Sequence, residues 1–135
     1  MKHEALTQQL IGLFYDVYNE LGHGFLESVY QKSYTLALQQ SGLRIEQQFP
    51  VKVSFRGLEV GEFRADILVE SLVIVELKAL QALESVHERQ LTNYLKATDF
   101  EVGLLFNFGP RAQFRRLIFD NERKLARAAA GVSCP

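Results

Sequence analysis

The sequence lacks the features that would indicate a disulfide-stabilised, secreted or membrane protein. Cys134 is the only cysteine in 135 residues, so no disulfide framework or thiolate metal cluster can form within the chain, and a reducing, cytoplasmic setting is expected. No apolar run approaches the length of a membrane span, and the N-terminal residues lack the apolar core of a secretion signal. We therefore expect no membrane partner.

The chain also lacks a net charge of either sign. Fifteen basic residues stand against sixteen acidic ones, which gives a formal net charge of −1 at pH 7. A strongly basic domain would be the plain sign of a nucleic-acid partner, but a local basic patch can act in a protein that is neutral overall. Net charge therefore neither predicts nor excludes nucleic acid.

The length and composition are those of one globular domain. The chain is 47% hydrophobic and 23% charged, and 135 residues suffice to bury a core. No internal repeat, low-complexity segment or long polar linker divides it. We expect a single domain over residues 1–120, followed by a tail over residues 121–135 that forms a short helix or frays.

Hydrophobic spacing predicts the order of the secondary-structure elements. Helices are expected over residues 4–21, 26–40 and 83–97, and strands over residues 43–55, 58–69, 73–80, 102–108 and 114–119. Pro50 places the first strand at an edge or at a bulge. The order α-α-β-β-β-α-β-β predicts an α/β fold with a mixed sheet flanked by helices, and the third helix should connect two parallel strands.

A predicted β-hairpin over residues 63–80 carries three charged residues in apolar surroundings. If residues 70–72 form its loop, Asp66 lies directly opposite Glu76, and Lys78 shares their face because strand side chains alternate. A two-residue loop would instead mix charge into both faces of the hairpin. The three-residue loop is favoured because it sorts charged and apolar side chains cleanly.

Two explanations fit these three charges. The first is a sheet face open to water. The second is a divalent metal ion, because two carboxylates placed opposite each other repel unless a cation lies between them. Such an ion polarises a phosphodiester and acidifies bound water, and Lys78 would either stabilise the charge that develops on the phosphate or help to position and deprotonate the water.

The pattern formed by Asp66, Glu76 and Lys78 resembles that of the PD-(D/E)XK nuclease superfamily. Ala65 stands where a proline is expected before the first acid. Three further stretches resemble the GxxExxY family within that superfamily: residues 24–30 (GFLESVY), 86–98 (VHERQLTNYLKAT) and 103–109 (GLLFNFG). The similarity extends from the first predicted helix to Phe119.

The resemblance implies a restriction-endonuclease-like fold and hydrolysis of DNA phosphodiester bonds with Mg²⁺ or Mn²⁺. Asp66 and Glu76 would be metal ligands, and Lys78 would be the catalytic lysine. Glu27 would add a helix carboxylate that binds the metal directly or through water. An ordinary first-turn carboxylate, favoured by the helix dipole, is the alternative for Glu27.

Gln90 and Tyr94 match a Q-x-x-x-Y element found in some branches of the superfamily. Four residues apart, they share one face of the third predicted helix and would either line the active site or lie on the helix surface. Arg64, Arg89 and Lys96 are the predicted contacts to nucleic acid, which would be salt-dependent phosphate contacts.

Two other functions remain open at this point. The chain could be a nuclease-fold module that binds nucleic acid or a protein partner without cutting. It could also be a small homodimeric interaction protein that uses its first helix as the contact face.

Overall fold

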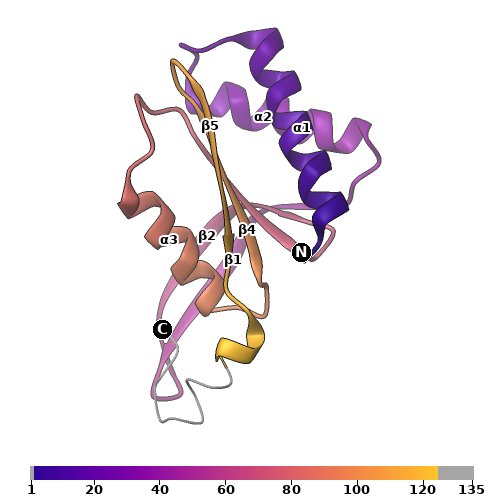
Figure 1. The fold of residues 1–135 in the computed structure, drawn as a ribbon. Coiled ribbons are helices and arrows are strands. Elements are labelled where there is room, and N and C mark those ends of the chain that lie inside the picture. The colour runs from indigo at the N-terminus through magenta and orange to yellow at the C-terminus, as the bar shows by residue number, and fades with distance from the viewer. Residues whose placement is uncertain (1, 125–135) are drawn as a thin grey trace.

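The computed structural model describes residues 2–124 (Figure 1). Residues 121–124 form one helical turn at the start of the predicted tail. The rest of that tail, including Cys134, lies outside the described residues. Within residues 2–124, no helix combines the length and apolar character that a membrane span requires.

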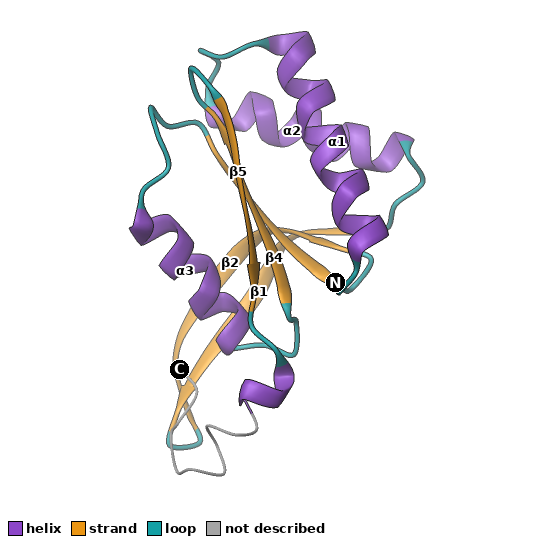
Figure 2. Ribbon diagram, in the orientation of Figure 1, coloured by secondary structure: helices purple, strands orange, loops and turns teal. Residues whose placement is uncertain are grey.

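Eight elements follow one another in the predicted order (Figure 2). They are α1 (Glu4–Leu21), α2 (Glu27–Gln40), β1 (Ile45–Phe55), β2 (Leu58–Val69), β3 (Val73–Lys78), α3 (Ser85–Lys96), β4 (Val102–Phe108) and β5 (Ala112–Ile118). The bounds of α1, β2 and β4 are those predicted. β1 begins two residues later than predicted and β5 two residues earlier.

The strands form one five-stranded mixed sheet in the order β1-β2-β3-β4-β5. β3 and β4 are parallel and α3 connects them, as predicted, while the other neighbours are antiparallel. Pro50 lies in the edge strand β1, where a missing N–H is tolerated. β1 is irregular at Gln48, which has φ +52° and is not paired with Asp66, and again between Val53 and Ser54, where the register shifts. This is the α/β fold that the order of elements predicts.

Helices cover both faces of the sheet, with α1 and α2 on one face and α3 on the other (Figure 1). Aromatic stacking joins the first pair of helices to β4. The Phe14 ring lies 4.5 Å from that of Phe106, and the Tyr30 ring lies 4.3 Å from that of Phe108. The buried side of α1 packs within the chain, and a homodimer that uses the exposed side of this helix stays a prediction.

On the other face, α3 packs unusually close to β4. A Cβ atom on Gly103 would lie 2.9 Å from the Leu91 Cγ atom, which is closer than packed side chains approach. Glycine at this position therefore lets the helix settle onto the strand. This contact fixes the height of α3 above the strands that carry the candidate site.

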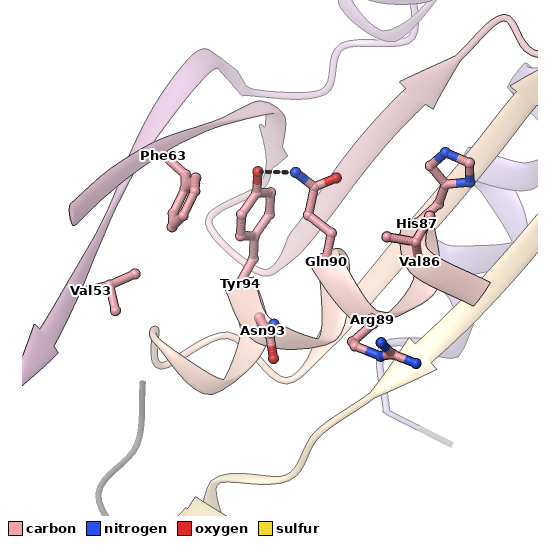
Figure 3. A pocket seen from close by; sticks show the side chains of 8 residues that line it. All are labelled: Val53, Phe63, Val86, His87, Arg89, Gln90, Asn93 and Tyr94. Carbon is pink, nitrogen blue, oxygen red and sulfur yellow. Dashed lines mark hydrogen bonds between the residues drawn. The ribbon is translucent and has the colours of Figure 1, made fainter. Parts of the chain in front are cut away.

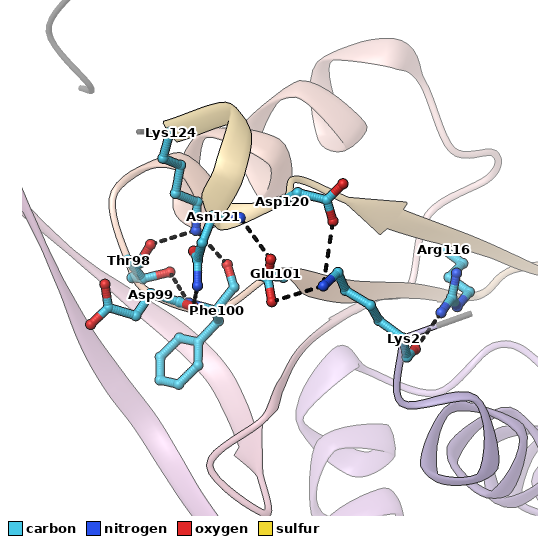
Figure 4. A network of polar contacts seen from close by, with 9 residues as sticks. All are labelled: Lys2, Thr98, Asp99, Phe100, Glu101, Arg116, Asp120, Asn121 and Lys124. Atoms are coloured by element: carbon cyan, nitrogen blue, oxygen red, sulfur yellow. Dashed lines mark hydrogen bonds and ion pairs between the residues drawn. The ribbon is translucent and has the colours of Figure 1, made fainter. Parts of the chain in front are cut away.

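A polar network ties the start of the chain to the end of the sheet (Figure 4). The Lys2 ammonium group lies 3.4 Å from the Glu101 carboxylate, which also accepts a hydrogen bond from the Asn121 N–H at 2.6 Å. Lys124 donates to the carbonyl oxygens of Thr98 and Phe100 at 2.6 and 2.8 Å. These contacts hold the 121–124 turn against the loop before β4.

Candidate active site

The β2–β3 hairpin has the predicted register. Val69 pairs with Val73 and Ile67 with Val75, so the loop comprises residues 70–72. The side chains of these four residues belong to the core beneath α1 and α2. Glu76, between Val75 and Leu77, therefore points toward the face covered by α3. Asp66 lies where β2 changes face, because Ile67 belongs to the core beneath α1 and α2 while Ala65 packs in the cluster beneath α3.

Beyond Ile67 and Val75 the paired ladder ends, and carboxylates replace the backbone acceptors. The Asp66 N–H donates to Glu76 Oε1 at 3.2 Å, and the Leu77 N–H donates to Asp66 Oδ2 at 2.8 Å. Each carboxylate thus binds the backbone of the opposite strand. These bonds fix both side chains at the point where β2 and β3 separate.

The Glu76 carboxylate lies in an unfavourable place for a negative charge. The residue is only 7% exposed, and burial raises the pKa of its carboxyl to about 9, with the nearby Asp66 charge adding to the shift and Lys78 opposing it. At neutral pH, Glu76 therefore keeps its proton unless a cation offsets the charge. A buried carboxyl with a strongly raised pKa beside a second carboxylate is typical of a functional site.

The donor set fits a hard divalent cation. Asp66 and Glu76 supply carboxylate oxygens, the ligands that Mg²⁺ and Mn²⁺ prefer, and a cation between them would relieve their repulsion. Within the described residues, no group of three His, Cys, Asp or Glu side chains is placed to hold a metal ion. The protein donors assembled here are thus two carboxylates, which suits an ion that keeps several waters.

Lys78 and Glu27 lie within electrostatic reach of this pair. Burial raises the pKa of Glu27, with Lys78 lowering it and Asp66 raising it. Glu27 is the first residue of α2, and so it reaches the site from the helical layer on the opposite face of the sheet. The structure therefore brings Glu27 near the carboxylate pair but does not assemble the three acids into one ligand cluster.

Tyr30 shapes the turn that presents Glu27. Its hydroxyl accepts a hydrogen bond from the Phe25 N–H at 3.2 Å and donates to the Gly22 carbonyl oxygen at 2.7 Å. Gly24 has φ +110°, a conformation that other residues rarely adopt. The glycine and the tyrosine of the GFLESVY stretch thus build the turn, and its glutamate lies within electrostatic reach of Lys78 and Asp66.

Gln90 and Tyr94 of α3 approach the site from above the sheet. The Gln90 side-chain amide donates to the Tyr94 hydroxyl at 3.2 Å. Burial raises the pKa of Tyr94, and the charges of Glu76 and Asp66 add to the shift. Tyr94 is buried beneath α3 and within electrostatic reach of the carboxylate pair, so the helix-surface alternative does not describe it. Gln90 is exposed on the helix surface and reaches the site only through Tyr94.

The three predicted nucleic-acid contacts are scattered. Arg64 donates to the Gln48 carbonyl oxygen at 3.3 Å and lies 3.3 Å from the Glu62 carboxylate, so its guanidinium is held beside β1. The Lys96 ammonium group lies 5.5 Å from the centre of the Phe119 ring. Arg89 alone lines the same cavity as Gln90 and Tyr94.

The chain is similar to known proteins in both sequence and fold. A family model described as the PD-(D/E)XK nuclease superfamily matches residues 4–117. The chain belongs to the PD-(D/E)XK nuclease superfamily. The crystal structure of SSO0001 is similar in fold, with a TM-score of 0.55 and 18% sequence identity. The match covers 76% of this chain and 55% of that one, so this chain spans about half the length of SSO0001. None of the curated proteins matches this chain.

Two residues that the sequence analysis did not single out support the site in this superfamily member. Asn107 is fully buried; its side chain accepts from the Leu80 N–H at 2.8 Å and donates to the Leu80 carbonyl oxygen at 3.0 Å. A Cβ on Gly109 would collide with that carbonyl oxygen. Both hold the chain just after Lys78, and a lone asparagine within the apolar run 102–108 is the signal that would have identified it.

Proposed function

We propose that the protein is a metal-dependent nuclease of the GxxExxY branch that hydrolyses DNA phosphodiester bonds. The observation that carries the proposal is the carboxylate pair. Asp66 and Glu76 are locked by hydrogen bonds to each other's strands, and Glu76 is buried and resists ionisation without a cation. Membership of the PD-(D/E)XK nuclease superfamily supports the same reading.

In this proposal Asp66 and Glu76 hold Mg²⁺ or Mn²⁺, and Glu27 contributes through water. When bound, the ion polarises the phosphodiester and acidifies water. Binding also requires Glu76 to release its proton, so the metal competes with protons at this residue. Burial thereby links the affinity for metal to pH.

Lys78 carries the positive charge nearest to the pair along β3. Its ammonium group would stabilise the negative charge that develops on the phosphate, or orient and deprotonate the attacking water. The loop that follows is held by Asn107, which keeps the end of β3 in place. Lys78 therefore starts from a rigid strand rather than from a mobile loop.

Gln90 and Tyr94 complete the site without adding charge. Joined by a hydrogen bond, they offer a hydroxyl and an amide beside the carboxylates. Both groups can bind a phosphate oxygen or a water molecule. We assign them to positioning of the substrate or the water.

The test combines metal binding with cleavage. Purified protein is titrated with Mn²⁺ by calorimetry and incubated with single-stranded, duplex and branched DNA in Mg²⁺, Mn²⁺ or EDTA. Metal-dependent cleavage that disappears in both Glu76→Ala and Lys78→Ala supports the proposal. Absence of Mn²⁺ binding at millimolar concentration would refute it.

A third result would change the function rather than the site. If wild-type protein binds Mn²⁺ and DNA but cleaves none of the substrates, it is a nuclease-fold module that binds nucleic acid without cutting. The Lys78→Ala variant should bind Mn²⁺ whether the protein is a nuclease or a non-cutting module. It loses cleavage activity only if the wild-type protein is a nuclease.

A further inference from the structure

We propose that the cavity between α3 and the β1–β2 hairpin holds an unpaired nucleobase, so that the substrate is single-stranded DNA or an unpaired segment of DNA. The proposal rests on the nuclease function above and specifies the form of its substrate. It depends on the lining of the cavity, on an exposed aromatic ring and on the residue that the cavity shares with the candidate active site.

The cavity has a volume of about 490 Å³, within the range typical of small-molecule sites. Val53 and Phe63 line it from the hairpin, and Val86 and Tyr94 line it from α3 (Figure 3). Gly61 pairs with Val53 and carries no side chain, which leaves room on this side of the hairpin. The interior is thus apolar, with space for a planar group.

Phe63 is an aromatic residue that the fold does not cover. It is 45% exposed, although its ring lies 5.5 Å from that of Tyr94, tilted by 40°. Val86, which lines the same cavity, is also exposed, and apolar and aromatic side chains gathered around one cavity are typical of ligand-binding sites. Every nucleobase has an aromatic face, and base stacking on such side chains is a main source of single-strand affinity.

Polar groups stand at the rim of this apolar wall. Gln90 and Asn93 line the cavity with side-chain amides, which carry both donors and acceptors and can bind the edge of a base. Arg89 lines it as well and supplies a guanidinium group that suits phosphate. An apolar floor with amides and one cation at the rim fits a nucleotide better than a purely apolar partner.

Tyr94 joins the cavity to the candidate active site. Its ring lines the cavity, and the residue packs in the same buried cluster as Ala65, which directly precedes Asp66. A base stacked in the cavity would therefore belong to a nucleotide whose phosphate is near the carboxylates. In a duplex both faces of a base are covered by its neighbours, so only an unpaired or flipped base can enter.

Binding is measured separately from cleavage. Fluorescence anisotropy in EDTA compares a labelled single strand of about 12 nucleotides, its duplex and an abasic strand of the same length. The wild-type protein should prefer the single strand to both others. Replacing Phe63 by Ala should weaken binding of the single strand about 5- to 100-fold and leave binding of the abasic strand unchanged.

Three variants sharpen the measurement. Phe55→Ala is the matched control, since this phenylalanine is 50% exposed on the same hairpin and does not line the cavity. Phe63→Leu keeps apolar contact and loses the ring, so it should behave like Phe63→Ala. Gly61→Val adds a side chain beside Val53, and its Cβ would meet no atom within 4 Å, so the fold should tolerate it. Because the added side chain narrows the cavity, this variant should bind the single strand more weakly and bind the abasic strand as the wild type does.

The outcomes separate the two proposals. If binding depends on the bases and on Phe63 but no DNA is cleaved, the nucleobase-binding proposal is supported and the nuclease proposal is refuted. If cleavage requires Glu76 but normal and abasic strands bind equally well, the nuclease proposal is supported and the nucleobase-binding proposal is refuted. The cavity proposal also fails if Phe63→Ala matches Phe55→Ala, or if Phe63→Ala only dissociates a dimer detected by ultracentrifugation.

Discussion

The two ends of the β2–β3 hairpin hold the same residue type in opposite states. At the closed end, Glu70 accepts a hydrogen bond from the Arg44 N–H at 2.5 Å and lies 3.6 Å from the Arg44 Nε atom. The Arg44 backbone N–H, followed by the Arg44 charge, lowers the pKa of the Glu70 carboxyl. At the open end, burial and Asp66 raise the pKa of Glu76.

The difference shows where the hairpin depends on something outside the chain. Glu70 has its positive partner within the protein, at the surface, and needs nothing further. Glu76 is buried against a second carboxylate, with Lys78 as an insufficient counter-charge. An ionisable group left unfavourable by the fold is expected at a site that binds a ligand.

The largest expected effect is on cleavage. Glu76→Gln should abolish Mn²⁺ binding and lower metal-dependent cleavage by on the order of 10³-fold, because a neutral amide cannot replace a charged ligand. Glu70→Gln should leave cleavage within about two-fold. Calorimetry measures Mn²⁺ binding and single-turnover assays measure cleavage. If Glu70→Gln loses as much cleavage activity as Glu76→Gln, the two ends of the hairpin do not differ in function.

The next effect is stabilisation by metal. Because Mn²⁺ should bind the folded chain through Asp66 and Glu76, an excess of about 100 times its Kd should stabilise the wild type by about 2.7 kcal/mol. The melting temperature should then rise by several degrees, and it should not rise in Glu76→Gln. Glu70→Gln should respond as the wild type does, and a response in Glu76→Gln would place the ion elsewhere.

The pH dependence of stability should have opposite signs at the two ends. Glu76 binds its proton more tightly when folded, so without metal its contribution is complete below its ordinary pKa of 4.5 and is lost as pH rises toward about 9. Glu70 has a lowered pKa, so its contribution is present above 4.5 and is lost as pH falls through its folded pKa.

Urea unfolding in EDTA across this pH range tests the two signs. As pH rises from 4.5 toward 9, the free energy of unfolding of the wild type should fall steadily relative to that of Glu76→Gln. The free energy of unfolding of the wild type should fall relative to that of Glu70→Gln only as pH drops below about 4.5. If the difference in free energy of unfolding between wild type and Glu76→Gln does not change with pH, the Glu76 carboxyl is hydrated in the folded protein and its pKa is not raised.

The smallest effect concerns the turn before α2. Tyr30→Phe removes the hydroxyl that joins Phe25 and Gly22, and should cost about 1 kcal/mol of stability while also reducing cleavage through misplacement of Glu27. Tyr34→Phe is the matched control, because its buried hydroxyl bonds only the Leu10 carbonyl oxygen, away from that turn. It should lose similar stability and keep full activity; parallel losses of activity would refute a positioning role for Tyr30.

Much of the fold could be read from periodicity and loop length. The α1 helix and the β2 and β4 strands have the predicted bounds, since apolar spacing and the flanking turn residues mark their ends. The register of the hairpin followed from separating charged and apolar faces. The ends of β1 and β5 were less predictable, because pairing with neighbouring strands extends or shortens a strand independently of its own pattern.

The site was predictable as a set of residues and less so as a geometry. Alternation alone predicted Asp66, Glu76 and Lys78 on one face, and the structure places Asp66 and Glu76 within hydrogen-bonding reach of each other's strands. Alternation could not show that the ladder ends at Ile67 and Val75, so that the carboxylates bind backbone N–H groups instead. Nor could it distinguish a three-acid ligand cluster from a pair with Glu27 nearby, since that distance depends on how α2 packs.

By itself, the sequence determined the elements, their order and the opposition of two acids on one hairpin, because these follow from residue spacing along a single chain. Only the tertiary structure decided that Glu76 is buried, that Glu27 approaches from the far layer and that Phe63 and Tyr94 border a cavity. Those features arise where separate elements meet, and burial, charge and cavity shape depend on that packing.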